Sequence, residues 1–447
     1  MAKKMNFMVI LKALVIVVLT LLMLIPLALV SGSVSGRLQY KNDAISKITN
    51  SWGGQILIAA PILNIPYTTA VKDENGKVVD HTKSYAKFAP KNLTADVHIV
   101  TQTRTIGIFS VPVYVAEITL TGSFENQKQF ADFRIAESFL SLEINDLKGI
   151  STPEISWNGQ QTSFEPSTKA SPLQVTLTSV EEYSPSDSYT RYYDKQDSQM
   201  LQSLSAKIPL QDGVNKFTIK FSIKGSQAIS FVPLAKDNSF RIRSNWTTPN
   251  FSGSFLPDTK TINRTGFDAL WNINYLASGI PPRIDGANLS PSVFTTSLLI
   301  PIDNYKSAER ARKYGILFIV LTFIACFLFE VLSKKSIHPF QYLLVGLAMS
   351  LFYLLLLALS EFMPFALAYL IAAVAIILMI TLYAKFAIAK TLTFKQTSII
   401  AGAFVILYGY LYVLLQLKDI ALLFGAIGLF VALAAMMYAT RNINWYK

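Results

Sequence analysis

Two long apolar segments, residues 7–30 and 315–440, constrain the fold of this chain more than any other feature of its sequence. Both are dominated by Leu, Ile, Val, Ala and Phe, whereas residues 31–314 have the composition of a water-soluble domain. A helix of about 20 apolar residues crosses the roughly 30 Å hydrocarbon core of a bilayer. We therefore predict a membrane protein with three parts: a start and transmembrane anchor at 1–30, a water-facing domain at 31–314, and a helical transmembrane domain at 315–447.

The first apolar segment has one feature of a cleaved signal peptide, because Lys3 and Lys4 precede it. The apolar core of a signal peptide usually has about 7–15 residues. The segment from Phe7 to Val30 is longer and contains Pro26. It is therefore predicted to remain in the protein as an uncleaved anchor.

The second apolar segment divides into five predicted spans, which give six spans together with the anchor. Short polar or charged stretches separate them. The five spans are Gly315–Leu332, Tyr342–Ser360, Phe362–Tyr383, Ser398–Gln416 and Ile420–Thr440.

Basic residues in the short loops predict the orientation, because cytoplasmic loops carry an excess of Lys and Arg. Only Lys418 falls in a short loop on the side opposite the cytoplasm. Arg310, Arg312 and Lys313 do not follow the rule, but they adjoin a large translocated domain, where the rule is weak. The N-terminus and C-terminus are predicted to be cytoplasmic, and residues 31–314 to lie on the far side of the membrane, in the periplasm if the cell is Gram-negative. The basic residues placed in the cytoplasm are Lys3, Lys4, Lys334, Lys335, Lys385, Lys390, Lys395, Arg441 and Lys447.

The formal net charge of +12 does not indicate a nucleic-acid partner. Residues 31–314 hold 29 Lys or Arg and 25 Asp or Glu, so most of the excess lies in and beside the apolar segments. Nucleic-acid binding needs a clustered basic face. Cys326 is the only cysteine, which excludes a disulfide within the chain and a metal site built from cysteines.

Residues 31–314 are predicted to form a mostly antiparallel β domain. Phe217, Ile219, Phe221 and Ile223 alternate with polar residues, which is the period of a half-buried strand. The sequence leaves open whether the domain is one unit or two. Strands are predicted within 213–243 and at 65–72, 78–88, 93–103, 113–124, 138–144, 175–178, 267–275 and 293–299, with helices at 37–49 and 127–133 and a long loop at 181–200.

Glu330 and Glu361 are the strongest candidates for function in the helical part, because ionisable residues inside spans are costly and often functional. Both lie at predicted span ends, where a carboxylate can reach water, and at opposite membrane faces. Glu330 is also placed to pair with Lys334 one helical turn later. His338 precedes Pro339 at a membrane edge, where a role in capping the next helix is expected.

Arg243, Asn245 and Trp246 open a segment rich in aromatic residues, Gly and Pro. One interpretation is a strand that ends in a rigid, aromatic-packed turn. The other is a surface for a ligand or partner. No Gly-Xaa-Ser-Xaa-Gly, phosphate-loop, dinucleotide or zinc signature occurs in the sequence. We therefore expect no enzyme activity, no cofactor and no metal site.

Several runs of the sequence resemble the CreD family of bacterial inner-membrane proteins. The resemblance covers nearly the whole chain, is dense from Asn304 onward, and is not recognisable in residues 145–215. The runs are 310–317 (RARKYGIL), 329–330 (FE), 338–347 (HPFQYLLVGL), 352–361 (FYLLLLALSE), 440–446 (TRNINWY), 106–108 (IGI), 244–246 (SNW) and 255–257 (FLP).

The resemblance implies a Gram-negative inner-membrane protein under a carbon-source-responsive two-component system, associated with colicin tolerance and the response to β-lactams. It brings no catalytic residues to this chain. It adds interest to Glu330, His338, Gln341 and Glu361, which lie in matching runs.

The resulting hypothesis is a non-enzymatic protein of envelope maintenance or stress response. Its periplasmic domain would engage an envelope protein or lipid, and the bilayer would surround its helices. The alternative is a transporter or flippase-like component that uses the C-terminal helices.

Overall fold

The computed structural model divides the chain into two compact units, residues 43–301 and residues 1–42 with 302–447. The β-rich unit begins later than residue 31, because helix α2 (Leu24–Trp52) continues an apolar helical stretch that starts at Leu14. The structure describes residues 14–72, 78–126, 137–167, 173–179, 195–284, 292–298, 311, 314–333, 337–388, 394–417 and 420–441.

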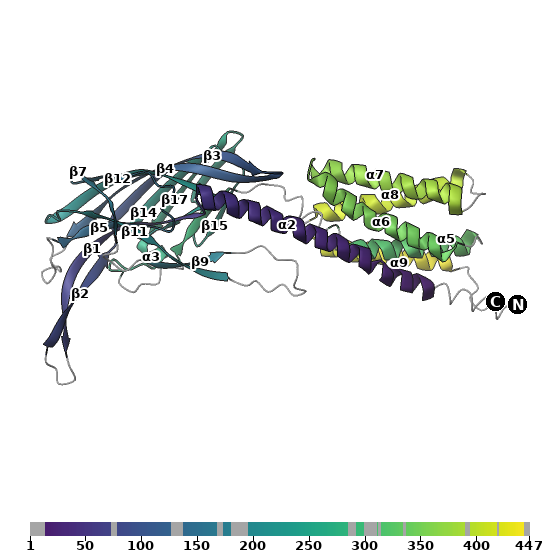
Figure 1. Ribbon diagram of the computed structural model, residues 1–447, viewed down its shortest axis with the longest axis horizontal. Helices are drawn as coiled ribbons and strands as arrows, with labels where there is room; N and C mark the ends of the chain where they lie inside the picture. Colours follow the sequence, from purple (N-terminus) through teal and green to yellow (C-terminus); the bar gives the residue numbers. More distant parts are fainter. Residues whose placement is uncertain are drawn as a thin grey trace. The chain divides into compact units, whose positions relative to one another are not determined.

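The helical unit contains helices at all five places where C-terminal spans are predicted (Figure 1). They are α5 (Gly315–Ser333), α6 (Pro339–Ser360), α7 (Phe365–Tyr383), α8 (Phe394–Gln416) and α9 (Ala421–Thr440). A π-helical turn, η4 (Ala384–Ile388), follows α7 directly.

Four helical stretches in the described residues are long and apolar enough to cross a membrane. They are Leu14–Trp52, Pro339–Ser360, Phe365–Phe386 and Thr397–Gln416, while the apolar stretches Gly315–Phe327 and Leu423–Ala434 are shorter. The chain is thus a membrane protein with four such helices and a large β-rich domain. The count of six spans stays a prediction.

The N-terminal helix packs on the helical unit through one buried stripe. Met23, Leu27, Val30 and Val34 repeat at intervals of three or four residues and are at most 6% exposed. A Cβ atom on Gly346 would lie 2.7 Å from Met23 Sδ. Small residues allow close approach between helices in membranes, so Gly346 fits the position where the N-terminal helix crosses α6.

The β-rich unit contains two eight-stranded sheets and a two-stranded ribbon. The first sheet has the order β15-β18-β13-β1-β5-β11-β8, with β2 paired to β1, and the second has the order β16-β17-β14-β3-β4-β12-β6-β7. The strands of the first sheet are β1 (Ile56–Lys72), β2 (Val78–Phe88), β5 (Phe139–Ile144), β8 (Glu165–Ser167), β11 (Gln202–Lys207), β13 (Ala228–Val232), β15 (Pro249–Gly253) and β18 (Phe294–Leu298). Those of the second are β3 (Asn92–Ile106), β4 (Phe109–Asn126), β6 (Glu154–Trp157), β7 (Gln160–Ser163), β12 (Gly213–Ser226), β14 (Asp237–Ser244), β16 (Thr259–Asn263) and β17 (Gly266–Asn274).

The prediction of a mostly antiparallel β domain is confirmed. The described strand pairs are antiparallel except β1 with β13 and β3 with β14. The predicted helix at 37–49 is confirmed as part of α2, whereas the one at 127–133 lies outside the described residues. The predicted loop at 181–200 is wrong at its end, because β10 (Lys195–Met200) pairs with β9 (Gln174–Ser179) to form the ribbon.

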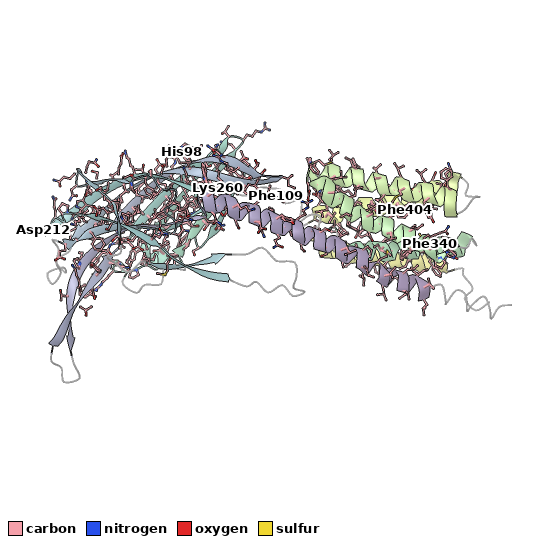
Figure 2. All side chains as sticks on the ribbon, in the orientation of Figure 1. His98, Phe109, Asp212, Lys260, Phe340 and Phe404 are labelled. Atoms are coloured by element: carbon pink, nitrogen blue, oxygen red, sulfur yellow. The ribbon has the colours of Figure 1, made fainter. Side chains whose placement is uncertain are left out.

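One continuous core joins the two sheets, so the β-rich region is one unit rather than two. The second sheet has an inner buried face and an outer exposed face, as the alternating burial along β3 and β14 shows. In the first sheet, residues 56–66 of β1 and the whole of β5 and β13 are buried on both faces. The second sheet therefore presents a water-facing surface, on which His98 lies (Figure 2).

Candidate functional site

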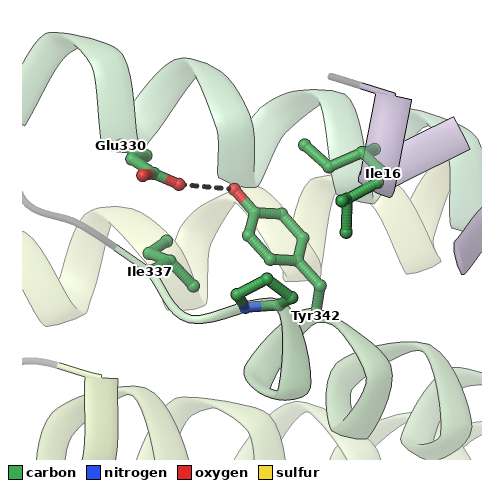
Figure 3. Close-up of a pocket in the computed structure, with 6 residues that line it drawn as sticks. Ile16, Glu330, Ile337 and Tyr342 are labelled. Carbon is green, nitrogen blue, oxygen red and sulfur yellow. Dashed lines mark hydrogen bonds between the residues drawn. The ribbon is translucent and has the colours of Figure 1, made fainter. Parts of the chain in front are cut away.

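Glu330 is buried inside the helical unit and contacts a tyrosine of the next helix. It lies on α5, is 8% exposed, and accepts a hydrogen bond of 3.1 Å from the Tyr342 hydroxyl on α6 (Figure 3). Ile16, Ile337 and these two side chains border a recess of about 10 Å³, space for at most about one water molecule. The expectation that this carboxylate reaches water is wrong, because α6 and the N-terminal helix cover it. Its predicted partner Lys334 lies outside the described residues.

His338 and Gln341 cap helix α6, so the expected capping role is confirmed. His338 Nδ1 accepts a hydrogen bond from the backbone N–H of Phe340 at 3.2 Å. Gln341 Oε1 accepts one from the backbone N–H of His338 at 3.0 Å. This reciprocal arrangement satisfies backbone donors that the first turn of a helix leaves unpaired.

Glu361 ends α6 and forms an ion pair with the N-terminal helix. Its carboxylate lies 3.0 Å from Arg37 Nε, and its side chain is only 6% exposed. Glu330 contacts the first turn of α6, and the 22 residues of that helix span about 33 Å. The two glutamates therefore do not form one site, as predicted.

A cavity of about 220 Å³, which was not predicted from the sequence, lies between α5, α6, α7 and α8. Its walls are almost entirely apolar, with Phe404 on α8 among them (Figure 2). Thr322 and Cys326 on α5 are the lining side chains with polar atoms. Ile337 lines both this cavity and the recess beside Glu330. This cavity is thus suited to an apolar molecule.

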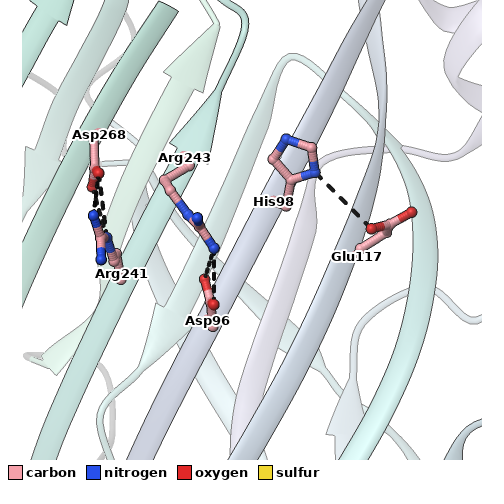
Figure 4. A network of polar contacts seen from close by, with 6 residues as sticks. All are labelled: Asp96, His98, Glu117, Arg241, Arg243 and Asp268. Carbon is pink, nitrogen blue, oxygen red and sulfur yellow. Dashed lines mark hydrogen bonds and ion pairs between the residues drawn. The ribbon is translucent and has the colours of Figure 1, made fainter.

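The exposed face of the second sheet carries a row of charged pairs that link neighbouring strands (Figure 4). Arg241 Nη2 lies 2.6 Å from Asp268, and Arg243 Nη2 contacts both carboxylate oxygens of Asp96 at 2.7 and 2.8 Å. The hydrogen bond from Arg241 holds the pKa of Asp268 below its usual value. Exposed pairs of this kind add little to stability, because water screens the attraction between their charges. Their main effect is to present both signs of charge on one surface.

Asn245 and Trp246 fix the end of strand β14. Asn245 Oδ1 accepts hydrogen bonds from the backbone N–H and the hydroxyl of Thr101, at 2.9 and 2.7 Å. Trp246 Nε1 donates to the carbonyl of Thr248 at 3.1 Å. These contacts favour the interpretation of a rigid turn over that of a ligand surface. Arg243, two residues earlier, belongs to the charged row instead.

A row of buried polar side chains in the first sheet was not predicted from the sequence. Glu143 on β5 is 0% exposed, and its Oε2 accepts a hydrogen bond of 2.8 Å from the backbone N–H of Leu173. Beside it, Asn64 Nδ2 donates to Ser141 Oγ at 2.8 Å. Burial raises the pKa of Glu143, although the Leu173 bond and the charge of Lys87 oppose the rise. The alternation of Ser141 and Glu143 with leucines was the available signal.

We expect Glu143→Gln to stabilise the β-rich unit at pH 8 by about 1–3 kcal/mol. Because the folded-state pKa is raised, the stability that Glu143 contributes is fully present below its unfolded pKa of about 4.3. That contribution is lost as the pH rises through the folded pKa, so a neutral amide is better tolerated at high pH. Thermal unfolding of the full-length protein in detergent, followed by tryptophan fluorescence, measures the effect.

Tryptophan emission reports mainly on the β-rich unit, because Trp52, Trp157, Trp246 and Trp271 lie in it and only one further tryptophan exists. The matched control is the exposed Glu154 on β6, whose change to Gln should leave the melting temperature unaltered. If Glu143→Gln raised the melting temperature equally at pH 4 and pH 8, ionisation of Glu143 would not be the cause of the stabilisation.

No group of three or more His, Cys, Asp or Glu side chains in the described part of the chain is arranged to hold a metal ion. His98 Nδ1 lies 4.0 Å from Glu117, its opposite partner in the β3–β4 pair (Figure 4).

The sequence is similar to known proteins over almost its full length. The profile of the family described as "Inner membrane protein CreD" matches residues 8–446. The Inner membrane protein CreD of Escherichia coli strain K12 is 31% identical over 444 residues, which cover 95% of this chain and 91% of that protein. Together with its apolar helices, this match places the protein in the inner membrane, which it crosses more than once. The chain belongs to the CreD family of inner membrane proteins.

Proposed function

We propose that this protein maintains the cell envelope without catalysis, by binding an envelope protein or lipid through its β-rich unit. The observation that carries the proposal is the exposed outer face of the second sheet. An antiparallel sheet that packs on one side leaves its other side to water or to a partner. Strands β3, β4, β12, β14 and β17 contribute to this face, which gives a partner a broad and regular surface.

The charges on this face favour a protein partner. Lys216, Lys220 and Lys224 alternate with buried residues along β12, while Asp96 and Glu117 contribute negative charge on β3 and β4. Complementary charges steer association and select between partners more than they add affinity. A surface with both signs suits a protein of mixed charge better than a uniformly anionic membrane surface.

The orientation belongs to the same proposal. Six spans with both termini in the cytoplasm would put the β-rich unit in the periplasm, where envelope proteins are available to it. The distribution of basic residues over the short loops supports this arrangement. Fusion of an export-dependent reporter enzyme at residue 200 should give an active reporter, and cytosolic activity at that site would overturn the orientation.

Site-specific photo-crosslinking in intact cells tests the partner. A photoreactive amino acid at the exposed positions Thr94 on β3 or Lys220 on β12 should capture an envelope protein or lipid. The control position is Leu276, which is 76% exposed but lies on α3 (Tyr275–Ser278) rather than on the sheet face. Capture of no envelope component from either sheet position would contradict the proposal.

A transporter or flippase-like role has one supporting observation, the buried carboxylate of Glu330 within the helical unit. A pathway for a polar solute needs polar side chains along a cavity. The cavity between the helices is lined mostly by apolar residues, and Glu330 is not among them. The structure therefore supports the envelope-maintenance proposal better.

A further inference from the structure

We propose that the cavity between α5, α6, α7 and α8 binds one acyl chain of a bilayer phospholipid. The cavity opens to the surface of the helical unit, where two of its lining residues, Ala325 on α5 and Ala403 on α8, are exposed. Because α6, α7 and α8 are apolar enough to cross a membrane, the medium at this opening is lipid. This binding would be separate from the proposed engagement of a partner by the β-rich unit.

The size of the cavity fits part of an acyl chain. An apolar protein cavity of about 150 Å³ stays dry and takes up a molecule as large as benzene. This cavity is larger, about 220 Å³, and its walls are similarly apolar. A void that no atoms fill loses the dispersion contacts of its lining. A lipid chain from the surrounding bilayer would restore those contacts without the need to desolvate a polar group.

The direction of the chain follows from which residues line the cavity. Ile337 and Ala384 lie at helix ends, just before α6 begins and just after α7 ends. Thr322 and Leu407 lie well inside α5 and α8. The cavity therefore extends from one membrane edge toward the middle of the helices, as an acyl chain does within one leaflet.

The edge end of the cavity is suited to the phosphate of the same lipid. Ala384 opens the π-helical turn η4, and the next residue, Lys385, is exposed. Single π-helical turns occur often at functional sites. A lysine near a membrane surface attracts anionic lipid. The geometry thus combines an apolar slot for a chain with a cation beside its outer end.

Reconstitution of the full-length protein with a photoreactive lipid tests this inference. The vesicles contain phosphatidylethanolamine, phosphatidylglycerol and a trace of phosphatidylglycerol that carries a diazirine near the end of one acyl chain. After irradiation, mass spectrometry locates the crosslinks in the chain. We expect them to concentrate at residues 321–326 and 399–407, which line the cavity.

A cavity-filling variant provides the decisive comparison. Ala403→Phe should lower crosslinking at 321–326 by at least about fivefold, because the added ring occupies the opening. Its matched control is Ala375→Phe, at an exposed position on α7 that does not line the cavity, and this change should have no effect. Lys385→Gln should lower the crosslink yield and leave its positions unchanged.

Three results would overturn the inference. Crosslinks spread evenly over exposed positions such as Leu370 and Leu378 would indicate only the general lipid contact of any membrane protein. An unchanged pattern in the Ala403→Phe variant, with the same thermal loss of helical circular dichroism as the wild type, would show that the cavity is not the binding site. A bound molecule of another class, found by native mass spectrometry of the purified protein, would replace the phospholipid as its occupant.

Discussion

Gly266→Ala is expected to lower the free energy of unfolding of the β-rich unit by about 3–5 kcal/mol. Gly266 begins β17 with a φ of 143°, a backbone conformation that residues with a side chain rarely adopt. A Cβ atom at this position would lie 1.9 Å from the carbonyl oxygen of Ser244, the last residue of β14. Backbone atoms cannot move aside as a flexible side chain can, so β14 and β17 would have to separate locally.

Tryptophan fluorescence of the full-length protein during heating measures this loss as a fall in melting temperature of roughly 6–20 °C. Gly159→Ala is the matched control, because Gly159 also has a positive φ, of 84°, but no neighbouring heavy atom lies within 4 Å of its added Cβ. Gly159→Ala should lower the free energy of unfolding only by the strain of a positive φ, about 1–2 kcal/mol. Equal losses in the two variants would show that the close contact with Ser244 is not the cause.

Strands of the second sheet could be predicted from the sequence because one face of that sheet is exposed to solvent. Residues 217–223 and 267–274 alternate apolar and polar side chains, and both ranges lie in strands with alternating burial. Residues 56–62 of β1 are buried on both faces. Their sequence therefore lacks the alternation of apolar and polar residues that would identify a strand. In β10 every residue except Met200 is polar, so the sequence does not indicate a strand, and the strand forms by pairing with β9.

The candidate residues could be named from the sequence more easily than their partners. Glu330 and Glu361 stand out because each is a charge within an apolar segment. Their contacts, Tyr342 and Arg37, depend on how the helices are rotated against one another, which a hydropathy pattern does not contain. The cavity beside α5 was unpredictable for the same reason, since a void is the result of packing between four elements.

The fold also explains why the interface between the sheets should be sensitive to a single aromatic residue. Phe294 on β18 is 0% exposed and stacks on Trp271 of the second sheet, with ring centroids 5.0 Å apart. It also meets Phe240 of the second sheet edge-on at 5.0 Å and Phe231 of its own sheet at 5.8 Å. The phenyl ring therefore fills the space where four strands from two sheets meet.

Phe294→Ala is expected to destabilise the β-rich unit by about 3–5 kcal/mol, because it removes buried apolar area and leaves a cavity between two sheets that cannot both move inward. The tryptophan-monitored melting temperature should fall, and the emission of the folded protein should change, since Trp271 loses a stacked neighbour. Leu276→Ala, at a position 76% exposed on α3, is the control and should change stability by less than about 0.5 kcal/mol. If the Phe294→Ala and Leu276→Ala variants had the same melting temperature, the two sheets would not depend on this aromatic contact. The inference of a single continuous core for the β-rich unit would then be wrong.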